Sequence, residues 1–367
     1  MIPIRITLFF TLMSALPLIS ACSEQQQEDS FTTDIPAEET QKPVEVEYQV
    51  IAENLKVPWE IANEGDTFYI SERPGTIITV EGDEQTRKPV NFSENLSSQP
   101  EAGLLGIALP QDFAETKTAY AYYSYKENDK FYQRVVEIKE SGDSWEETKV
   151  LLDEIPGGRF HQGGRIAIGP DQKLYVTTGD ATNPDSAQNL ESLAGKILRM
   201  NLDGSIPEDN PFDKSYVYTY GHRNPQGLAW NSANELYATE HGSDSMDEIN
   251  LITQANNYGW PEIRGDKTEH GMIPPVIHSG EISWAPSGMT YFKGSFYFAS
   301  LGGEGLRRFN LESKKETLIV DDVGRVRDVH ATSEGIYFVT NNTDGRGDPA
   351  VNDDRLLFVP ASELAAD

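Results

Sequence analysis

The chain has 367 residues, and its 59 acidic side chains outnumber its 30 basic ones, so the formal charge is −29 at pH 7. This charge argues against DNA or RNA as the main partner, because phosphate recognition needs a basic footprint. The single cysteine excludes an intramolecular disulfide and a zinc site built from thiolates. The length accommodates one large domain or two ordinary ones.

Residues 1–21 are predicted to be a signal peptide, because an apolar stretch from Ile6 to Ile19 follows Arg5 and is too short for a confident transmembrane span. The sequence that ends at Cys22 resembles a bacterial lipobox, in which the cysteine is acylated and becomes the mature N-terminus. Lipidation of Cys22 would anchor the protein to a membrane on the extracytoplasmic side, at the cell surface or in the periplasm. The alternative is an ordinary secretory signal with an incidental cysteine.

Residues 22–47 are predicted to be a disordered acidic tether. The segment contains eight Asp and Glu residues against Lys42, together with two prolines and a run of three glutamines. Such a composition cannot bury enough apolar surface to offset the entropy of ordering the chain. An acidic recognition tail is the functional alternative.

The rest of the chain repeats one unit, in which a tyrosine lies within a short apolar, strand-forming run. The six tyrosine units are 68–70, 119–122, 174–176, 236–238, 296–298 and 336–338. Each is followed by a second strand-like run, at 77–80, 134–138, 196–200, 248–252, 306–309 and 355–359. Turn-forming residues precede several of the units, and no long amphipathic helix competes with the strands.

Six strand pairs over about 315 residues predict an all-β fold, a six-bladed β-propeller of four-stranded antiparallel blades. The propeller should span residues 48–361 and leave a short tail at 362–367. The alternative is a pair of β-sandwiches with accidentally placed tyrosines. Three long loops, at 180–195, 203–216 and 256–284, are expected to gather at one mouth, where a propeller carries its site.

A histidine and an aspartate are candidates for acid–base chemistry. His161 precedes Gln162, Gly163 and Gly164, and two glycines allow close approach of a ligand to the backbone. Asp180 ends the next strand, from where a carboxylate could orient the imidazole of His161. Simpler explanations are a histidine that caps a turn and an aspartate that starts one.

Three arginines point to an anion. Arg223 lies in the polar segment 221–227, and its planar guanidinium suits carboxylates and quinone-like carbonyls. Arg325 and Arg327 are two residues apart, so on a strand their side chains share a face. In a chain of charge −29, two such arginines suggest a bound polyanion, although a salt-bridged pair on a strand would explain them equally well.

The segment 240–248 is rich in oxygen ligands of the kind that calcium prefers, and it lies close in sequence to 256–261. Its spacing is not that of an EF-hand, so the prediction of calcium from these residues is weak. An acidic, solvated loop is the alternative.

Taken together, these segments resemble the soluble PQQ-dependent sugar dehydrogenases, the glucose/sorbosone and aldose sugar dehydrogenase family. The resemblance covers about residues 48–360. The segments that carry it stand in the same order as in that family: 101–108, 161–165, 195–207, 221–227, 247–261 and 325–329. The family fold is a six-bladed propeller, in agreement with the repeat count.

The resemblance implies a function, the oxidation of aldose sugars at C1 to lactones with hydride transfer to PQQ. His161 would be the general base and Asp180 its partner. Arg223 and Asn224 match residues at the quinone side of PQQ, and Arg223 is expected to take part in catalysis. Glu101 would face the sugar, because the glucose enzyme has a glutamine there.

Further contacts with PQQ and with calcium are implied in the same way. Arg325 and Arg327 match the pair that holds the PQQ carboxylates. Gly242 and Ser243 match positions whose backbone carbonyls bind the active-site calcium. Glu248 and the carbonyl of Tyr258 match part of a second calcium site. The implied partners are therefore a sugar substrate, an unidentified electron acceptor and, through Cys22, a membrane.

Two departures from the glucose enzyme alter the local charge. The stretch 300–305 lacks a lysine that contacts PQQ in that enzyme, and Asn341 stands where it has an aspartate. These departures leave open a propeller that binds a carbohydrate or a protein without catalysis. A calcium-dependent hydrolase of lactones is a further alternative, but it would need a carboxylate-rich central calcium site, whereas the arginines suit an anionic cofactor better.

Overall fold

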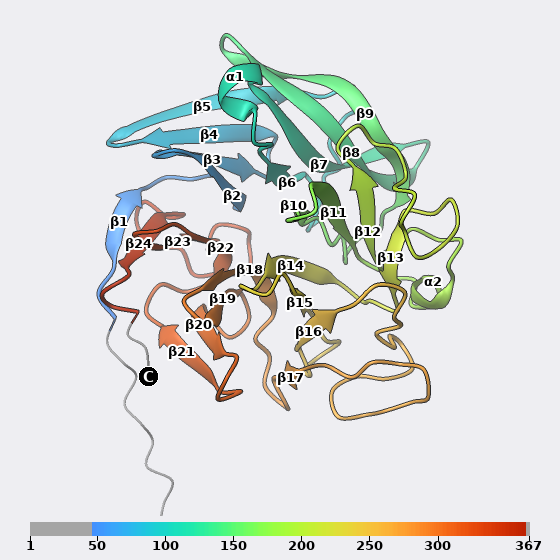
Figure 1. The fold of residues 1–367 in the computed structure, drawn as a ribbon. Helices are drawn as coiled ribbons and strands as arrows, with labels where there is room; N and C mark the ends of the chain where they lie inside the picture. Colours follow the sequence, from blue (N-terminus) through green and yellow to red (C-terminus); the bar gives the residue numbers. More distant parts are fainter. Residues whose placement is uncertain (1–45, 365–367) are drawn as a thin grey trace, which may run out of the picture. The chain divides into compact units, whose positions relative to one another are not determined.

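The computed structural model describes residues 46–364, which form six four-stranded antiparallel sheets arranged around a central axis (Figure 1). Four of the sheets are separate. The other two join into one eight-stranded sheet through a short parallel pairing of Val90 with Trp145 and Asn91 with Glu146. The predicted six-bladed propeller is therefore confirmed. Cys22, the signal peptide and nearly all of the tether lie outside the described residues.

Each blade contributes one strand to each of four concentric rings. The innermost strands are β2 (Pro58–Glu64), β6 (Leu104–Ala108), β10 (Ile166–Ile168), β14 (Pro225–Trp230), β18 (Pro286–Phe292) and β22 (Val326–Ala331). The second strands are β3 (Thr67–Glu72), β7 (Thr118–Glu127), β11 (Lys173–Thr178), β15 (Leu236–Glu240), β19 (Ser295–Ser300) and β23 (Gly335–Thr340).

The third strands are β4 (Thr76–Glu81), β8 (Lys130–Ser141), β12 (Lys196–Asn201), β16 (Glu248–Ile252), β20 (Gly305–Asn310) and β24 (Leu356–Pro360). The outer strands are β5 (Glu84–Asn91), β9 (Ser144–Pro156), β13 (Val217–Tyr220), β17 (Ile277–His278), β21 (Glu316–Val320) and β1 (Gln49–Ala52). Two single-turn helices, α1 (Phe113–Thr116) and α2 (Asp185–Gln188), lie in loops. Between residues 46 and 364, no helix is long and apolar enough to cross a membrane.

The ring is closed by strands from both ends of the domain. β1 pairs antiparallel with β24, so the first strand of the chain completes the last blade (Figure 1). The pairing places Gln49 opposite Phe358 and Val50 opposite Leu357. Because the last blade needs both ends of the domain, separation of these ends would open the ring.

The repeated tyrosine units explain the blades. All six fall on second strands, and the runs that follow them fall on third strands. The central strands bury both faces, and the buried apolar residues form six clusters, one at each contact between neighbouring blades. Strands buried on both faces need continuous rather than alternating apolar residues, which is the pattern that the sequence carries.

The expected gathering of the three long loops is correct for two of them. Gln188 in loop 180–195 donates hydrogen bonds to the Asn257 side chain at 3.1 Å and to the Trp260 carbonyl at 2.6 Å. Loop 203–216 instead leaves the opposite end of β12, where Arg199 binds both Asp209 and Asp171. The prediction for this loop is wrong because a connection that follows a third strand begins at the opposite end of the blade. Loop 256–284 also follows a third strand, but it returns to the first end, where the Tyr258 N–H donates to the Tyr220 carbonyl at 2.9 Å.

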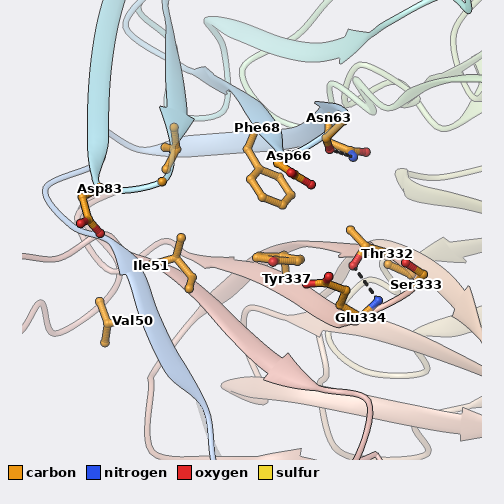
Figure 2. Close-up of a pocket in the computed structure, with 14 residues that line it drawn as sticks. Val50, Ile51, Asn63, Asp66, Phe68, Asp83, Thr332, Ser333, Glu334 and Tyr337 are labelled. Carbon is orange, nitrogen blue, oxygen red and sulfur yellow. Dashed lines mark hydrogen bonds between the residues drawn. The ribbon is translucent and has the colours of Figure 1, made fainter.

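A wide pocket of about 680 Å³ opens between the first and last blades. Figure 2 shows Phe68 on one side of it and Ile51 and Tyr337 on the other, with Asp66, Asp83 and Glu334 around them. The rings of Phe68 and Tyr337 are 4.3 Å apart between centroids, so the two blades touch beneath the opening. None of the predicted site residues within 46–364 lines this pocket. Size alone therefore does not identify the functional site.

Candidate active site

Two sets of loops converge at one end of the central axis. The first set directly precedes innermost strands and carries Glu101, His161, Arg223 and Arg325. The second set directly follows second strands and carries Arg73, Asp180, His241 and Asn341. Antiparallel strands place these two kinds of loop at the same end of every blade. Residues from most of the blades therefore face one another there.

His161 and Asp180 form a hydrogen-bonded pair. The Nδ1 atom of His161 lies 2.7 Å from Oδ1 of Asp180, which is fully buried. The second oxygen of Asp180 accepts a hydrogen bond from the Trp260 indole N–H at 2.9 Å. With both oxygens engaged, the carboxylate fixes the ring orientation of His161 and leaves its Nε2 available.

The backbone of His161 is held in an unusual conformation. Its φ is 61°, in a region that few non-glycine residues adopt. Its N–H donates a hydrogen bond to Oε2 of Glu101 at 2.8 Å. A Cβ atom on Gly163 would lie 2.5 Å from the Thr177 carbonyl, so this glycine is needed for packing against β11 as well as for lining a pocket. The local strain is of the kind found at functional sites.

Glu101 is ionised and fixed in place. Burial alone would raise its pKa, but the His161 N–H and the Arg346 guanidinium outweigh burial, so the pKa lies below its usual value. Oε1 of Glu101 is 3.2 Å from Nη1 of Arg346. Arg73 donates to the carbonyls of Pro100 and Ala102, on either side of Glu101. The carboxylate is thus held beside the histidine by two contacts, and Arg73 holds the backbone on either side of it.

Arg223 and Asn224 pack against the histidine and aspartate. The Arg223 carbonyl accepts the Asp180 N–H at 2.8 Å, and its guanidinium lies 5.4 Å from the centre of the Trp260 ring. The Arg223 Nε atom is buried and has no hydrogen-bond partner. The side-chain oxygen of Asn224 accepts the Gly163 N–H at 2.9 Å. Arg223 therefore has an unused donor, whereas the oxygen of Asn224 already has a structural role.

Arg325 and Arg327 lie on one side of β22, as the i, i+2 spacing predicts. Arg325 binds Asp344 at 3.0 Å and the Leu301 carbonyl at 2.9 Å. Arg327 is buried and donates to the neutral side chains of Gln226 at 2.8 Å and Ser287 at 3.3 Å. Burial, followed by the nearby charge of Arg73, lowers the pKa of Arg327 to about 9. The two arginines therefore differ, because Arg325 has a carboxylate partner and Arg327 has neutral ones.

Asn341 lies against both arginines. Its carbonyl accepts from Nε of Arg325 at 3.3 Å. With its amide turned so that the oxygen faces Arg327, it accepts from Nε of that arginine at 2.9 Å. An asparagine here supplies a neutral acceptor, so the positive charge of Arg327 is not cancelled.

A narrow pocket lies between these groups and has the charge that an anionic cofactor requires. It is lined by Trp59, Arg73, Glu101, Gln162, Gly163, Gln226, His241, Leu301, Arg327 and Arg346. Three guanidiniums face one carboxylate, and the Nε2 atom of His241 is buried without a partner. A planar trianion such as PQQ would relieve the repulsion between the arginines. The cavity itself is only about 20 Å³, room for about one water molecule, so the charges suit PQQ but the lining side chains would have to move apart to admit it.

An adjoining pocket contains most of the predicted calcium-binding positions. It is lined by Gly221, Arg223, Glu240, His241, Gly242, Met246, Glu248, Tyr258, Trp260, Ile263 and Arg264. Burial raises the pKa of Glu248 to about 7, and its two hydrogen-bond donors, the Gly265 N–H and the Asn250 amide, are neutral. A buried carboxylate without a cationic partner fits a metal ligand.

The other calcium candidates are placed as follows. Gly242 donates its N–H to Asp247 at 2.7 Å, and the Ser243 hydroxyl accepts from Arg264. The Tyr258 hydroxyl is engaged by Leu251 and Thr253. Within residues 46–364, no group of three or more His, Cys, Asp and Glu side chains could hold a metal. A cation at this place would therefore depend largely on backbone carbonyls, as the resemblance implies for Gly242, Ser243 and Tyr258.

Sequence reasoning missed three groups at this site. Arg73 and Arg346 line the narrow pocket beside Arg327. They supply positive charge there, whereas stretch 300–305 lacks the lysine that the glucose enzyme has. Trp260, which lies in the segment 256–261, donates its indole N–H to Asp180. A positional signal was available for Arg73, because it directly follows a tyrosine strand, as Asp180 and His241 do. Arg346 lies in the longer loop between β23 and β24 and has no such signal.

Comparisons with known proteins agree with this geometry. A family model described as Glucose / Sorbosone dehydrogenase matches residues 55–351. Quinoprotein glucose dehydrogenase B of Acinetobacter calcoaceticus is 34% identical over 298 residues, which cover 71% of this chain and 61% of that enzyme. Aldose sugar dehydrogenase YliI of Escherichia coli is 27% identical over 349 residues, which cover 83% of this chain and 92% of that enzyme.

A solved structure, the PQQ-bound form of the aldose sugar dehydrogenase of Streptomyces coelicolor, matches with a TM-score of 0.80 and 37% identity. The match covers 87% of this chain and 99% of that one. The similarity therefore extends over the whole propeller and includes all six blades.

Proposed function

Because the chain belongs to the glucose/sorbosone dehydrogenase family of oxidoreductases, we propose that it oxidises aldose sugars at C1 to lactones with PQQ as the hydride acceptor. The observation that carries this proposal is the His161–Asp180 pair, 2.7 Å apart, beside a pocket with three guanidiniums. A base and a cationic cavity are the two features that sugar oxidation by an anionic quinone requires.

His161 is the general base of the proposed reaction. An Nδ1–H donated to Asp180 leaves Nε2 as the acceptor of the C1 hydroxyl proton of the sugar. Asp180 stabilises the imidazolium that then forms, and the Trp260 N–H keeps the carboxylate from rotating. Glu101 lies close enough, through its bond to the His161 N–H, to accept a hydrogen bond from a sugar hydroxyl.

The cofactor would be held by the arginines, and a calcium ion would lie in the adjoining pocket. PQQ, when bound, supplies the hydride acceptor. Among the described residues, Arg223 has a buried Nε donor without a partner, Arg327 has no carboxylate partner, and Arg325 is shared with Asp344. Gly242 and Ser243 would offer backbone carbonyls to calcium, and Glu248 and Tyr258 would hold a cation on the far side of the pocket. Arg73 and Arg346 add the positive charge that stretch 300–305 lacks.

A reconstitution experiment tests the proposal. The protein is titrated with PQQ in the presence of calcium, and an aldose is then offered with an artificial electron acceptor. We expect saturable PQQ binding and turnover that falls by about 10²–10⁴-fold in His161→Ala, the usual contribution of a general base.

His278→Ala is the matched control, because the His278 side chain is 19% exposed and lies beside an aspartate, as does that of His161. It should turn over at the wild-type rate. Equal turnover of wild type and His161→Ala, or no PQQ binding at all, would refute the proposal.

We also propose that the protein is an extracytoplasmic lipoprotein held at a membrane by Cys22. The support is the lipobox-like sequence before the single cysteine of the chain. Two or more acyl chains would anchor the propeller stably, whereas one would bind only reversibly. In a bacterial host, labelled palmitate should be incorporated into the wild type and not into Cys22→Ala. Release of unlabelled wild-type protein into the soluble fraction would contradict this anchor.

A further inference from the structure

Glu101 and Arg346 form an ion pair between residues that lie far apart in the sequence. Glu101 lies in the loop before β6, and Arg346 lies between β23 and β24, so the pair joins the second blade to the sixth. Both side chains line the pocket beside His161, and their nearest atoms are 3.2 Å apart. The pair therefore stands next to the base of the proposed reaction.

Both members of the pair are fixed by further contacts. The second oxygen of Glu101 accepts the His161 N–H at 2.8 Å. The Arg346 N–H donates to Asp344 at 2.9 Å, and the other oxygen of Asp344 binds Arg325 at 3.0 Å. The backbone N–H positions this turn of the chain, and the guanidinium of Arg346 has a second acidic neighbour, because its Nε lies 4.0 Å from Oδ2 of Asp344.

The exposure of the pair shows that it borders the entrance. The Glu101 side chain is 19% exposed and that of Arg346 is 41% exposed, whereas Arg327 behind them is buried. A sugar that approaches His161 from solvent therefore meets one fixed negative and one fixed positive charge.

We propose that the Glu101–Arg346 pair is a specificity determinant that restricts the site to neutral sugars. This inference rests on the proposed sugar dehydrogenase function. A neutral sugar can donate a hydroxyl to Glu101 and accept from Arg346 without separating them. The carboxylate of a uronic acid would either be repelled by Glu101 or bind Arg346 and break its ion pair with Glu101. The ammonium group of an amino sugar would either be repelled by Arg346 or bind Glu101 and break the same ion pair. Each charged sugar leaves one charge of the pair without its partner.

Single substitutions should open the site to one charged class each. Glu101→Gln keeps an oxygen acceptor for the His161 N–H and leaves Arg346 with only the more distant carboxylate of Asp344, 4.0 Å from its Nε. We expect the ratio of kcat/KM for glucuronate to that for glucose to rise about fivefold, the upper size of one partly exposed charge pair. Arg346→Gln should raise the ratio for glucosamine to a similar degree. The double variant removes the penalty for both classes, so both ratios should rise, each by less than in the corresponding single variant, because no attractive charge is left.

Two further measurements separate a charge effect from a structural one. The gains should shrink at high ionic strength, because salt screens partly exposed charges. Glu140→Gln is the matched control, since the Glu140 side chain is also 19% exposed and paired, with Lys88 at 2.6 Å. Its substrate ratios should equal those of the wild type.

A binding assay distinguishes failure of this inference from failure of the proposed function. Saturation-transfer NMR of glucuronate with the PQQ-free protein needs no turnover, and the signal should be stronger for Glu101→Gln than for the wild type. If PQQ binds and glucose is oxidised but neither the ratios nor the NMR signal change, the pair does not determine specificity. If glucose is not oxidised, the proposed function fails, and equal NMR signals would then overturn this inference as well.

Discussion

Two buried arginines on the central axis border different pockets and have different charged neighbours. Arg165 lies between two carboxyl groups, 3.1 Å from Glu60 and 2.9 Å from Asp328, and burial raises the pKa of Glu60 to about 8. Arg327 hydrogen-bonds to neutral side chains and lies near Arg73. One arginine has two acidic partners, and the other lies in an excess of positive charge.

The two arginines share their remaining neighbours, which makes the comparison close. Both guanidiniums pack against Trp59, Arg165 at 4.4 Å and Arg327 at 5.8 Å from the ring centre. Both also bind Gln226, Arg165 through the backbone carbonyl and Arg327 through the side chain. The acidic partners therefore distinguish the two arginines. Arg165 belongs to a structural ion cluster, although its Nη2 atom has no hydrogen-bond partner, whereas Arg327 has no carboxylate partner of its own among residues 46–364.

The largest effect that this comparison predicts is on stability. Arg165→Met removes the shared cation of Glu60 and Asp328 and leaves two buried carboxyl groups unpaired. We expect the free energy of unfolding to fall by about 3–5 kcal/mol, as when one partner of a buried ion pair is removed. Denaturant-induced unfolding followed by tryptophan fluorescence measures it.

Arg327→Met is the matched variant for the arginine without a carboxylate partner. Removal of this guanidinium relieves its repulsion with Arg73, so the unfolding free energy of the PQQ-free protein should change by at most about 1 kcal/mol. PQQ affinity should instead weaken by roughly tenfold or more, because a hydrogen bond between charged groups is lost. Equal losses of unfolding free energy in the two variants would contradict the different roles of the two arginines. Weaker PQQ binding in Arg165→Met alone would contradict them as well.

The sequence could predict the blades because the signals for them are local. Each tyrosine unit and the run that follows it form one hairpin, so a spacing of a few residues defines two neighbouring strands. The pairing of β1 with β24 could not be found in this way, because it joins Gln49 to Phe358. The end of the blade at which loop 203–216 lies could not be predicted without knowing which strands of the blade this loop connects.

In the candidate site, too, local sequence signals indicate some residues, and contacts between distant residues determine others. His161, Asp180, Arg223 and Arg325 stand in dense polar motifs beside strand ends, so residue type and position were enough to select them. The Glu101–Arg346 pair spans 245 residues, and no local spacing indicates it. Whether an arginine lies in a complete or an incomplete charge cluster depends on such distant contacts, as Arg165 and Arg327 illustrate.

The smallest predicted effect extends the comparison to a carboxylate that lacks a cation. Glu248 is buried, its donors are neutral, and its pKa is raised to about 7. The folded protein therefore holds a proton on Glu248 that the unfolded chain loses near pH 4.5. This group accordingly makes the calcium-free protein less stable as pH rises from about 4.5 to 7.

Calcium at Glu248 would have to displace that proton. Its affinity should therefore be about tenfold higher at pH 8 than at pH 6, because one proton leaves as the cation binds. Calorimetric titration at the two pH values measures this, and Glu248→Gln, which cannot ionise, should bind calcium weakly and with little pH dependence. An equal pH dependence in Glu248→Gln would mean that a group other than Glu248 releases the proton when calcium binds. Glu248 would then be a buried structural carboxyl group and not a calcium ligand.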